Sequence, residues 1–301
     1  MMGKRTGIWQ SATDARAFVV LIFLIAALPC LLLVETAAQE LPRQSALAIT
    51  KQKVGLTDIT LTFGRPNVRG RKGKIWGKLI PYDQLWRAGA NECTTIEAST
   101  DIIFGGKKLP AGRYSFFVVP RKKGTWTVIL NTDTQLWGTE GYDNKKDTLR
   151  IEVKPEKTHF IETLVFFFDA ISTDEASLIL GWESKRIVIP IQVDTVKYAL
   201  KNIEKAIEER PEDWQVYVRS ADYLRAYDPE KALEWANQAI RLHAEHFWAY
   251  WIKAEILALN RDYAAAVENA QKALFWGLKE AGEQFPYRQK IESQIEVWET
   301  F

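Results

Sequence analysis

Between residues 63 and 92 the sequence places arginines, two asparagines and a glutamate among tryptophans and glycines. Guanidinium groups bind carboxylates and phosphates through two parallel hydrogen bonds. Tryptophan rings beside them can stack on a sugar or another planar group. We therefore expect a ligand site on this segment. Its predicted residues are Arg65, Arg71, Trp86, Arg87, Asn91 and Glu92.

The same segment has two other interpretations. In the first, an ion pair between an arginine and Glu92 ties a loop to the following strand, and the glycines supply left-handed turns. In the second, Glu92 acts as an acid or base and Arg87 holds an oxyanion, as in a hydrolase or isomerase. All three interpretations remain open on the sequence alone.

Other catalytic and metal-binding patterns do not occur in the sequence. Histidine is found only at His159, His243 and His246, without the Cys/His spacing of a metal site. Neither a phosphate-binding loop nor a Gly-x-Ser-x-Gly turn is present. We predict no metal and no cofactor, and we expect a binding protein rather than an enzyme.

The net charge of the 301-residue chain is +2, which gives no argument for nucleic acid or an anionic membrane as a partner. We expect no nucleic acid partner. Basic residues do cluster locally, and we interpret the cluster as a solvated loop rather than an anion site. The cluster comprises Arg65, Arg69, Arg71, Lys72 and Lys74.

The N-terminal residues 1–38 have the pattern of a secretory signal peptide. Basic residues precede an uncharged run at 17–34, and the small residues Thr36 and Ala38 fit a cleavage site. The run is also just long enough for an uncleaved membrane anchor. Either interpretation places the folded part outside the cytoplasm, in the periplasm or cell envelope. Cys30 belongs to this leader, so Cys93 is the only cysteine after it, and we interpret Cys93 as a small apolar residue.

Residues 45–193 read as an antiparallel β-sandwich or barrel. Apolar residues alternate with threonines at 54–63, which is typical of a half-buried strand. Gly105-Gly106 is expected to form a hairpin turn, and residues 82–86 a single helical turn. The further predicted strands are 94–98, 114–119, 126–130, 149–153, 161–168, 176–182 and 186–193.

From residue 195 to 301 the hydrophobic period becomes helical. The expected helices are one from 195 that ends before Pro211, then 214–226, 229–242, 247–259, 263–276 and 284–298. Three alanines recur 34 residues apart, as Ala232, Ala236 and Ala239 and then Ala266, Ala270 and Ala273. Small residues at this step resemble tetratricopeptide repeats, helix pairs that bury their apolar faces by stacking. Ala270 departs from the large aromatic residue common at its position.

Tetratricopeptide-like repeats imply a protein partner. We expect it to dock on a groove lined by the aromatic residues Trp214, Tyr217, Trp248 and Trp251, which would act as binding anchors. The alternative is that these rings pack between helices.

Five strings within residues 54–193 resemble the bacterial family named domain of unknown function 2911. They are Phe63 to Arg71, Ile75 to Tyr82, Leu85 to Glu92 with its Trp-Arg-x-Gly-Ala-Asn-Glu stretch, Lys108 to Ser115, and Trp126 to Asn131. The resemblance implies a β-rich domain with an export signal and no settled activity. The link at residues 71–74 is longer and more basic than is usual in the family, which leaves Lys72 and Lys74 without an implied role.

Together these features predict an exported binding protein of the cell envelope. Its β domain binds a glycan, a peptide or a small anion, and its helices dock a protein partner. The alternatives are an envelope hydrolase or isomerase that uses Glu92 with Arg87, and a purely structural spacer. A membrane is an expected partner only if the leader is uncleaved.

Overall fold

A computed structural model of the chain describes residues 41–301, of which residues 45–301 form one compact unit. The predicted signal peptide and Cys30 lie outside the described residues. No helix within the described part combines the length and hydrophobicity needed to cross a bilayer.

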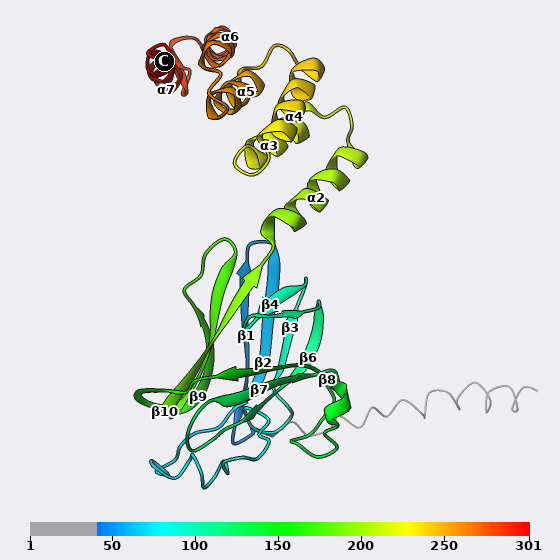
Figure 1. Ribbon diagram of the computed structural model, residues 1–301, viewed down its shortest axis with the longest axis vertical. Helices are drawn as coiled ribbons and strands as arrows, with labels where there is room; N and C mark the ends of the chain where they lie inside the picture. Colours follow the sequence, from blue (N-terminus) through cyan, green and yellow to red (C-terminus); the bar gives the residue numbers. More distant parts are fainter. Residues whose placement is uncertain (1–40) are drawn as a thin grey trace, which may run out of the picture. The chain divides into compact units, whose positions relative to one another are not determined.

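Two antiparallel sheets form the β domain (Figure 1). In spatial order, the six-stranded sheet contains β1 Ala46–Val54, β2 Thr57–Arg65, β3 Thr95–Ala98, β6 Gly112–Val119, β7 Trp126–Asn131 and β8 Asp147–Val153. The four-stranded sheet contains β5 Lys107–Leu109, β4 Ile102–Phe104, β10 Glu175–Val193 and β9 Glu156–Asp169.

The domain core lies between the facing sides of the two sheets. Alternation along β2 turns Ile59, Leu61 and Phe63 into this core, where none is more than 2% exposed. Phe63 meets Phe166 of β9 edge to face, with ring centroids 4.9 Å apart. Contacts of this kind across the sheets identify a sandwich.

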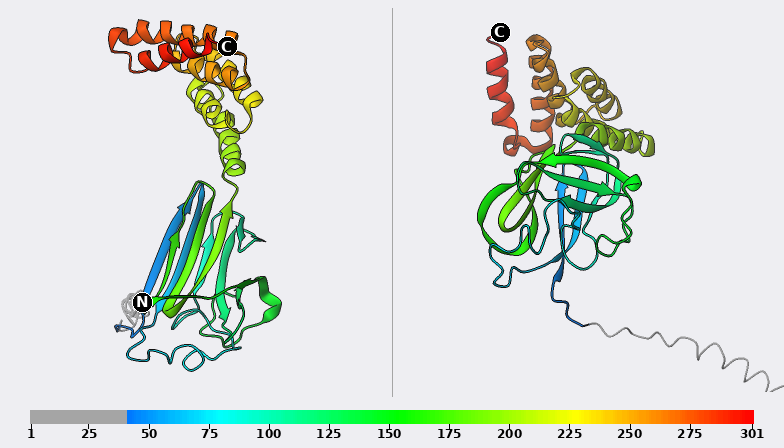
Figure 2. Two further views of the ribbon diagram at one scale, coloured as in Figure 1. Left: turned by 60° about the vertical axis from the view of Figure 1, so that its left-hand side comes forward. Right: turned by 60° about the horizontal axis from the view of Figure 1, so that its bottom comes forward.

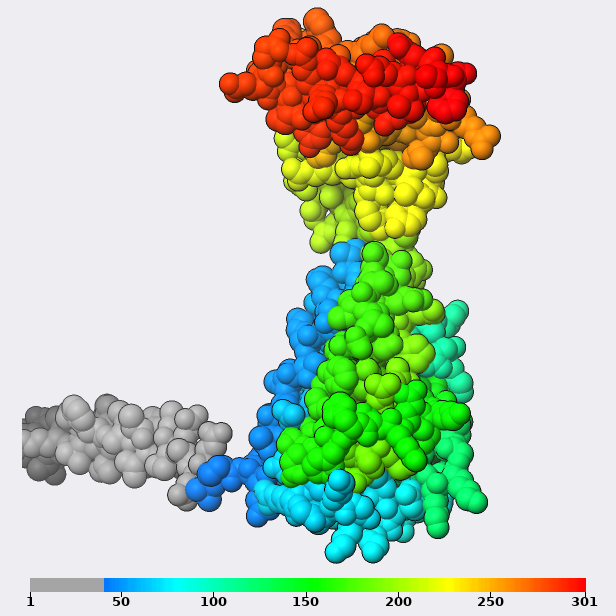
Figure 3. All heavy atoms as spheres, turned by 90° about the vertical axis from the view of Figure 1, so that its left-hand side faces the viewer, coloured from blue at the N-terminus to red at the C-terminus, as the bar shows by residue number. Residues whose placement is uncertain are grey.

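The outer face of the six-stranded sheet has a smaller apolar cluster. Cys93, Phe117 and Ile129 are buried there beneath Leu136 and Tyr142, which come from the β7–β8 connection. That connection includes the short 3-10 helix η2 Asn144–Lys146. A long irregular loop, 66–94, joins β2 to β3 and closes one end of the sandwich (Figure 3).

Several strand boundaries differ from the sequence prediction. β1 was not expected, and it pairs with β2 along its full length. The two strands predicted at 176–193 are the single strand β10, in which bulges near Glu183 interrupt the pairing with β9. The predicted helical turn at 82–86 is wrong, because these residues form turns and a bridge. Gly105-Gly106 does join β4 to β5.

Six α-helices follow within the described residues, with α3–α6 as consecutive helix pairs (Figures 1 and 2). They are α2 Thr195–Glu209, α3 Trp214–Leu224, α4 Pro229–Leu242, α5 Phe247–Leu259, α6 Tyr263–Ala281 and α7 Arg288–Trp298. The 3-10 helix η3 Gly282–Gln284 precedes α7. The predicted class, an antiparallel β-sandwich followed by a helical region, is confirmed.

Aspartates begin four of these helices by accepting a hydrogen bond from a backbone N–H in the first turn. They are Asp194, Asp213, Asp228 and Asp262. The six alanines of the 34-residue step are all 0% exposed, and they lie on α4 and α6. Because a methyl group is small, the neighbouring helices approach closely at these positions.

Candidate functional site

Trp86, a predicted ligand residue, belongs to the core. It is 5% exposed and stacks on Trp182, with ring centroids 6.0 Å apart. Trp76 lies 5.6 Å from Trp86 and 4.7 Å from Trp126. Trp76 and Trp86 come from the loop 66–94, Trp126 from β7 and Trp182 from β10, and the four rings pack together. The prediction that Trp86 stacks on a ligand is therefore wrong, because no face of its ring is free.

Arg65 and Arg71 direct their guanidinium groups at backbone carbonyls. Nε of Arg65 donates to the carbonyl of Leu164 at 2.9 Å. Nε and Nη2 of Arg71 donate, each at 2.8 Å, to the carbonyls of Val68 and Asn67. These bonds hold the loop to itself and to β9. A structural role through backbone carbonyls therefore accounts for both arginines.

Asn91 and Glu92 lie beside one another at the end of the loop 66–94. Asn91 has a φ of 63°, and its Nδ2 donates to the carbonyl of Ser45 at 3.0 Å. Ala46 pairs with Arg65, so Asn91 and Arg65 meet at the start of β1. The side chain of Glu92 is exposed, and its backbone bridges to Trp137 of the β7–β8 connection.

Arg87 is half-buried near that connection. Its Nε is buried without a hydrogen-bond partner among residues 41–301, and Nη1 lies 3.9 Å from the position of a Cβ on Gly138. The structure thus brings Arg87, Asn91 and Glu92 to one segment and places Arg65 near Asn91. Arg71 and Trp86 lie elsewhere in the loop.

Cys93 is a buried thiol and has no features of a nucleophile. Burial raises its pKa to about 11, although a hydrogen bond with Ser115 and the charge of Arg87 act in the opposite direction. A thiol with this pKa is almost fully protonated at neutral pH, whereas a nucleophilic cysteine needs a lowered pKa.

Two of the four aromatic residues predicted to bind a partner are buried. Tyr217 is 8% exposed and Trp251 is 2% exposed, and both belong to the helical core. The prediction that they line an open groove is wrong for that reason. Trp214 and Trp248 are half-buried, and Trp214 lies against the rings of His243 and His246 at 5.0 and 4.5 Å.

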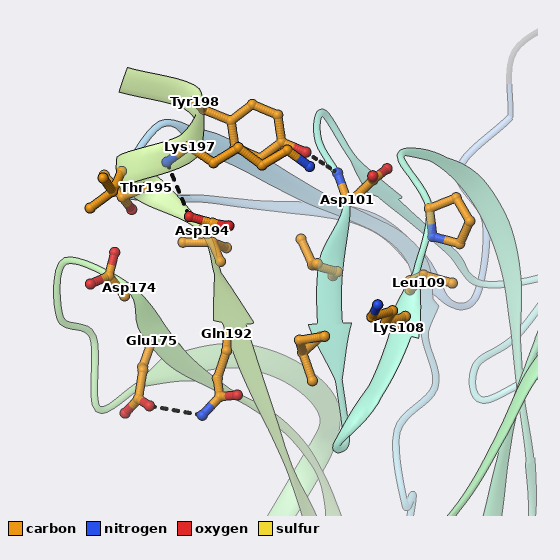
Figure 4. Close-up of a pocket in the computed structure, with 15 residues that line it drawn as sticks. Asp101, Lys108, Leu109, Asp174, Glu175, Gln192, Asp194, Thr195, Lys197 and Tyr198 are labelled. Carbon is orange, nitrogen blue, oxygen red and sulfur yellow. Dashed lines mark hydrogen bonds between the residues drawn. The ribbon is translucent and has the colours of Figure 1, made fainter. Parts of the chain in front are cut away.

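A cavity of about 640 Å³ lies where β10 meets α2 (Figure 4). β4 and β5 form one side, the β9–β10 turn forms the other, and the first turn of α2 lies above. Ile102, Leu109 and Val193 give it an apolar floor. This volume is in the range of small-molecule sites. None of the six predicted ligand residues lines the cavity.

Hydrogen bonds fix the geometry around this cavity. The backbone N–H of Asp101 donates to the Tyr198 hydroxyl at 3.1 Å, which joins β4 to α2. Gln192 donates through Nε2 to Glu175 Oε1 at 2.9 Å (Figure 4). In contrast, Oδ1 of Asp174 is buried and has no hydrogen-bond partner in the described part of the chain. A buried acceptor of this kind is costly unless something donates to it.

The charged groups of the cavity are unequally divided. Four carboxylates line it, those of Asp101, Asp174, Glu175 and Asp194, against the two ammonium groups of Lys108 and Lys197. Sequence reasoning missed this site because its residues come from four separate segments without a shared motif. The one visible signal was Asp194, which the change of hydrophobic period marked as a helix cap.

Comparison with known proteins gives one result for the β domain. No curated protein matches the chain. The family model described as "Protein of unknown function (DUF2911)" matches residues 45–191, which include nine of the ten strands in full and all but the last two residues of β10. The β domain therefore belongs to this family.

Proposed function

We propose that the chain is an exported binding protein of the cell envelope that binds a short zwitterionic peptide in the cavity between β10 and α2. The observation that carries the proposal is the unpaired, buried Oδ1 of Asp174 at a cavity rich in carboxylates. Export rests on the signal-like sequence of residues 1–38.

The arrangement of charges defines the ligand. Asp174 and Glu175 lie on the β9–β10 side of the cavity, and Lys108 lies on the β5 side (Figure 4). A ligand that crosses β10 and β4 would therefore place an ammonium group near the two carboxylates and a carboxylate near Lys108. Charge-assisted hydrogen bonds of this kind are stronger than neutral ones. A small anion fits less well because carboxylates outnumber lysines, and a neutral glycan leaves both charge sets unused.

The proposal is tested by calorimetric titration with tripeptides that differ in their N-terminal side chain and in C-terminal amidation. We expect Asp174→Asn and Glu175→Gln each to weaken binding about tenfold or more, as loss of a hydrogen bond to a charged group does. Glu140→Gln is the control, because it removes an exposed carboxylate on the β7–β8 connection. Equal affinities for all three variants would show that the cavity is not the peptide site.

For the helical region we propose tetratricopeptide-type packing and a protein partner. The support is the burial of all six alanines at the 34-residue step. Phe275 is 60% exposed and Tyr287 44% exposed, and they replace Tyr217 and Trp251 as candidate anchors. Cross-linking in the cell envelope tests this proposal. Phe275→Ser should abolish a specific cross-linked product that Ala264→Ser, at another exposed position of α6, leaves intact.

The two alternative functions gain no support from the geometry. A hydrolase or isomerase needs Glu92 to face Arg65 or Arg87 across a cavity. Arg65 instead donates to a backbone carbonyl, and the cavity beside α2 is lined by neither Glu92 nor Arg87. A purely structural spacer needs no cavity on the β domain, whereas a cavity is present at its junction with α2.

A further inference from the structure

One end of the β-sandwich gathers basic side chains from four separate segments. We call this surface the basic end. It is formed by the loop 66–82, the β6–β7 turn 120–125, the β8–β9 turn with the start of β9 at 154–157, and the β10 bulge 183–186. Its lysines are Lys72, Lys74, Lys78, Lys122, Lys123, Lys154, Lys157 and Lys185.

Specific contacts place these segments together. The backbone N–H of Gly73 donates to Glu183 Oε1 at 3.0 Å, which joins the loop to the β10 bulge. Lys185 of the bulge pairs in register with Lys157. The backbone N–H of Asp83 donates to the carbonyl of Pro120 at 2.8 Å, which brings the β6–β7 turn to the same end. Figure 3 shows the loop between β2 and β3, in cyan, forming this end of the domain.

Basic side chains outnumber carboxylates at the basic end. From Ile59 to Tyr82 the sequence has six basic residues and no acidic one. Lys74, Lys78, Lys122 and Lys123 are exposed, and none has a carboxylate within 4.0 Å among residues 41–301. Carboxylates do lie at this end: Glu162 accepts from the backbone N–H of Arg69 at 2.8 Å, and the charge of Lys72 acts on Glu183. Glu183 is 4% exposed and accepts from Gly73 and Ser184, Glu156 pairs with Arg186, and Asp83 and Glu152 pair with Arg121.

Apolar side chains are exposed between these lysines. Leu79 is 43% exposed and Phe160 is 42% exposed, and the ammonium of Lys72 lies 5.3 Å from the centroid of the Phe160 ring. Lysines beside exposed leucine and aromatic residues are typical of protein surfaces that contact the headgroup region of a bilayer. A site for a soluble polyanion has no use for the exposed Leu79.

The tip that carries Lys78 and Leu79 is held in place by the backbone. The N–H of Ile80 donates to the carbonyl of Ile75 at 2.9 Å, and that of Gly77 donates to the carbonyl of Ile80 at 2.7 Å. Ile75 and Ile80 are buried beneath the tip, at 0% and 9% exposure. The charged and apolar groups of the tip are therefore presented outward by a fixed loop, which lowers the ordering cost of binding.

The chain also enters the domain at this end. Ala46 pairs with Arg65, which leads directly into the loop 66–82, and Ser45 accepts a hydrogen bond from Asn91. Ten residues separate the end of the uncharged run 17–34 from Ser45. If that run stays in a membrane, ten extended residues keep Ser45 within about 35 Å of the bilayer.

We propose that the basic end is a membrane-contact surface that binds the anionic phospholipid headgroups of a bilayer, with Leu79 and Phe160 entering the headgroup region. The unpaired lysines supply the electrostatic attraction, and the two apolar side chains distinguish a bilayer from a soluble polyanion. This binding needs neither the cavity beside α2 nor a partner for the helices.

The test is co-sedimentation of the chain from Gln39 onward with vesicles. This chain lacks the leader, which would insert by itself, and it retains the compact unit with both hydrophobic cores. The vesicles contain phosphatidylcholine alone or mixed with phosphatidylglycerol. We expect binding to the mixed vesicles only, and we expect it to weaken as salt is added.

Matched variants isolate the surface. Replacing Lys74, Lys78, Lys122 and Lys123 together by glutamine should weaken vesicle binding by at least about 100-fold, given the attraction of each lysine to an anionic surface. The control variant replaces four lysines that are exposed elsewhere by glutamine: Lys145, Lys201, Lys205 and Lys279. Its vesicle binding should stay within about threefold of that of the unmodified chain. Circular dichroism and thermal unfolding establish that both variants are folded.

A third variant separates a bilayer from other polyanions. Leu79→Ser should weaken binding to the mixed vesicles and leave binding to heparin or DNA unchanged. The proposal is overturned if the two lysine variants bind vesicles alike. It is also overturned if the chain binds heparin or DNA as tightly as vesicles and Leu79→Ser has no effect, since the surface would then be a soluble-polyanion site.

Discussion

The backbone N–H of Gly73 and Oε1 of Glu183 are 3.0 Å apart and form a hydrogen bond between a surface loop and an interior strand. Glu183 sits at a bulge of β10 with a φ of 56° and is 4% exposed. Ser184 also donates to Oε2 of Glu183, through its backbone N–H and its hydroxyl. A buried carboxylate is stable in such a place only with donors of this kind.

Glu183→Gln should destabilise the β domain, by about 1–3 kcal/mol, because its donors lose a charged acceptor. Burial by itself would raise the pKa of Glu183, but the hydrogen bonds from Ser184 and Gly73 and the charge of Lys72 lower it below the usual 4.5. The stabilisation is therefore complete above about pH 4.5 and is lost as the pH falls through the lower, folded-state pKa. Urea unfolding at several pH values measures the free energy of unfolding of the unmodified chain and of Glu183→Gln. The difference between the two free energies should shrink as the pH is lowered. A difference that does not change with pH would contradict this account.

Trp86→Ala should cost about 3–5 kcal/mol of unfolding free energy, since it removes a buried ring that stacks on Trp182. Trp137→Ala is the matched control, because Trp137 is 62% exposed and its removal should change stability by no more than about 0.5 kcal/mol. Chemical unfolding followed by circular dichroism measures both. Equal stabilities of the two variants would show that Trp86 is not a core residue.

The burial of Cys93 predicts both low reactivity and a pH dependence. In the chain from Gln39 onward, a thiol reagent at mildly alkaline pH should react only after urea unfolds the protein. Because the pKa rises from 9.0 to about 11 on folding, the contribution of Cys93 to stability is present below about pH 9 and lost between pH 9 and 11. Cys93→Ala should remove that part of the alkaline decline. Rapid labelling of the folded chain would contradict the burial.

Gly277→Ala tests the packing of α6 on the segment that follows it. Alanine ordinarily stabilises a helix interior by about 1 kcal/mol relative to glycine. Here the added Cβ would clash with the ring of Phe285, which is 5% exposed, so the helical region should lose about 1–3 kcal/mol. In a Phe285→Ala background the same substitution should become stabilising. Thermal unfolding of the unmodified chain, the two single variants and the double variant measures both effects.

The sequence predicted the elements whose signals are local. The 34-residue alanine step indicated which faces of α4 and α6 are buried, and Gly105-Gly106 indicated a hairpin turn. Both signals depend on a few neighbouring residues. The sequence predicts two strands in place of β10 because bulges at Glu183 break its apolar alternation, and the pairing with β9 that continues across the bulges is not visible in one stretch of sequence. β1 was missed because its exposed Leu47 and Ile49 blur the distinction between its two faces.

The candidate sites were harder to predict, for a physical reason. In the sequence, Trp86 and Trp251 cannot be distinguished from tryptophans that stack on a ligand or bind a partner. Only the tertiary packing shows that both are buried. The cavity beside α2 forms where four separate segments meet, so no single stretch indicates it. The cluster that includes Arg69, Lys72 and Lys74 was interpreted as a solvated loop, and its enlargement by lysines from three other segments became visible only in the fold.

The buried alanines of α4 and α6 determine which surfaces of the helical region can change without disturbing its packing. Ala232, Ala236 and Ala239 of α4 and their counterparts in α6 are fully buried against the neighbouring helices. Substitutions on the solvent side of α4 and α6 leave those contacts untouched. The exterior of these helices can therefore change, and acquire new binding preferences, while the buried face that contains the alanines keeps its packing.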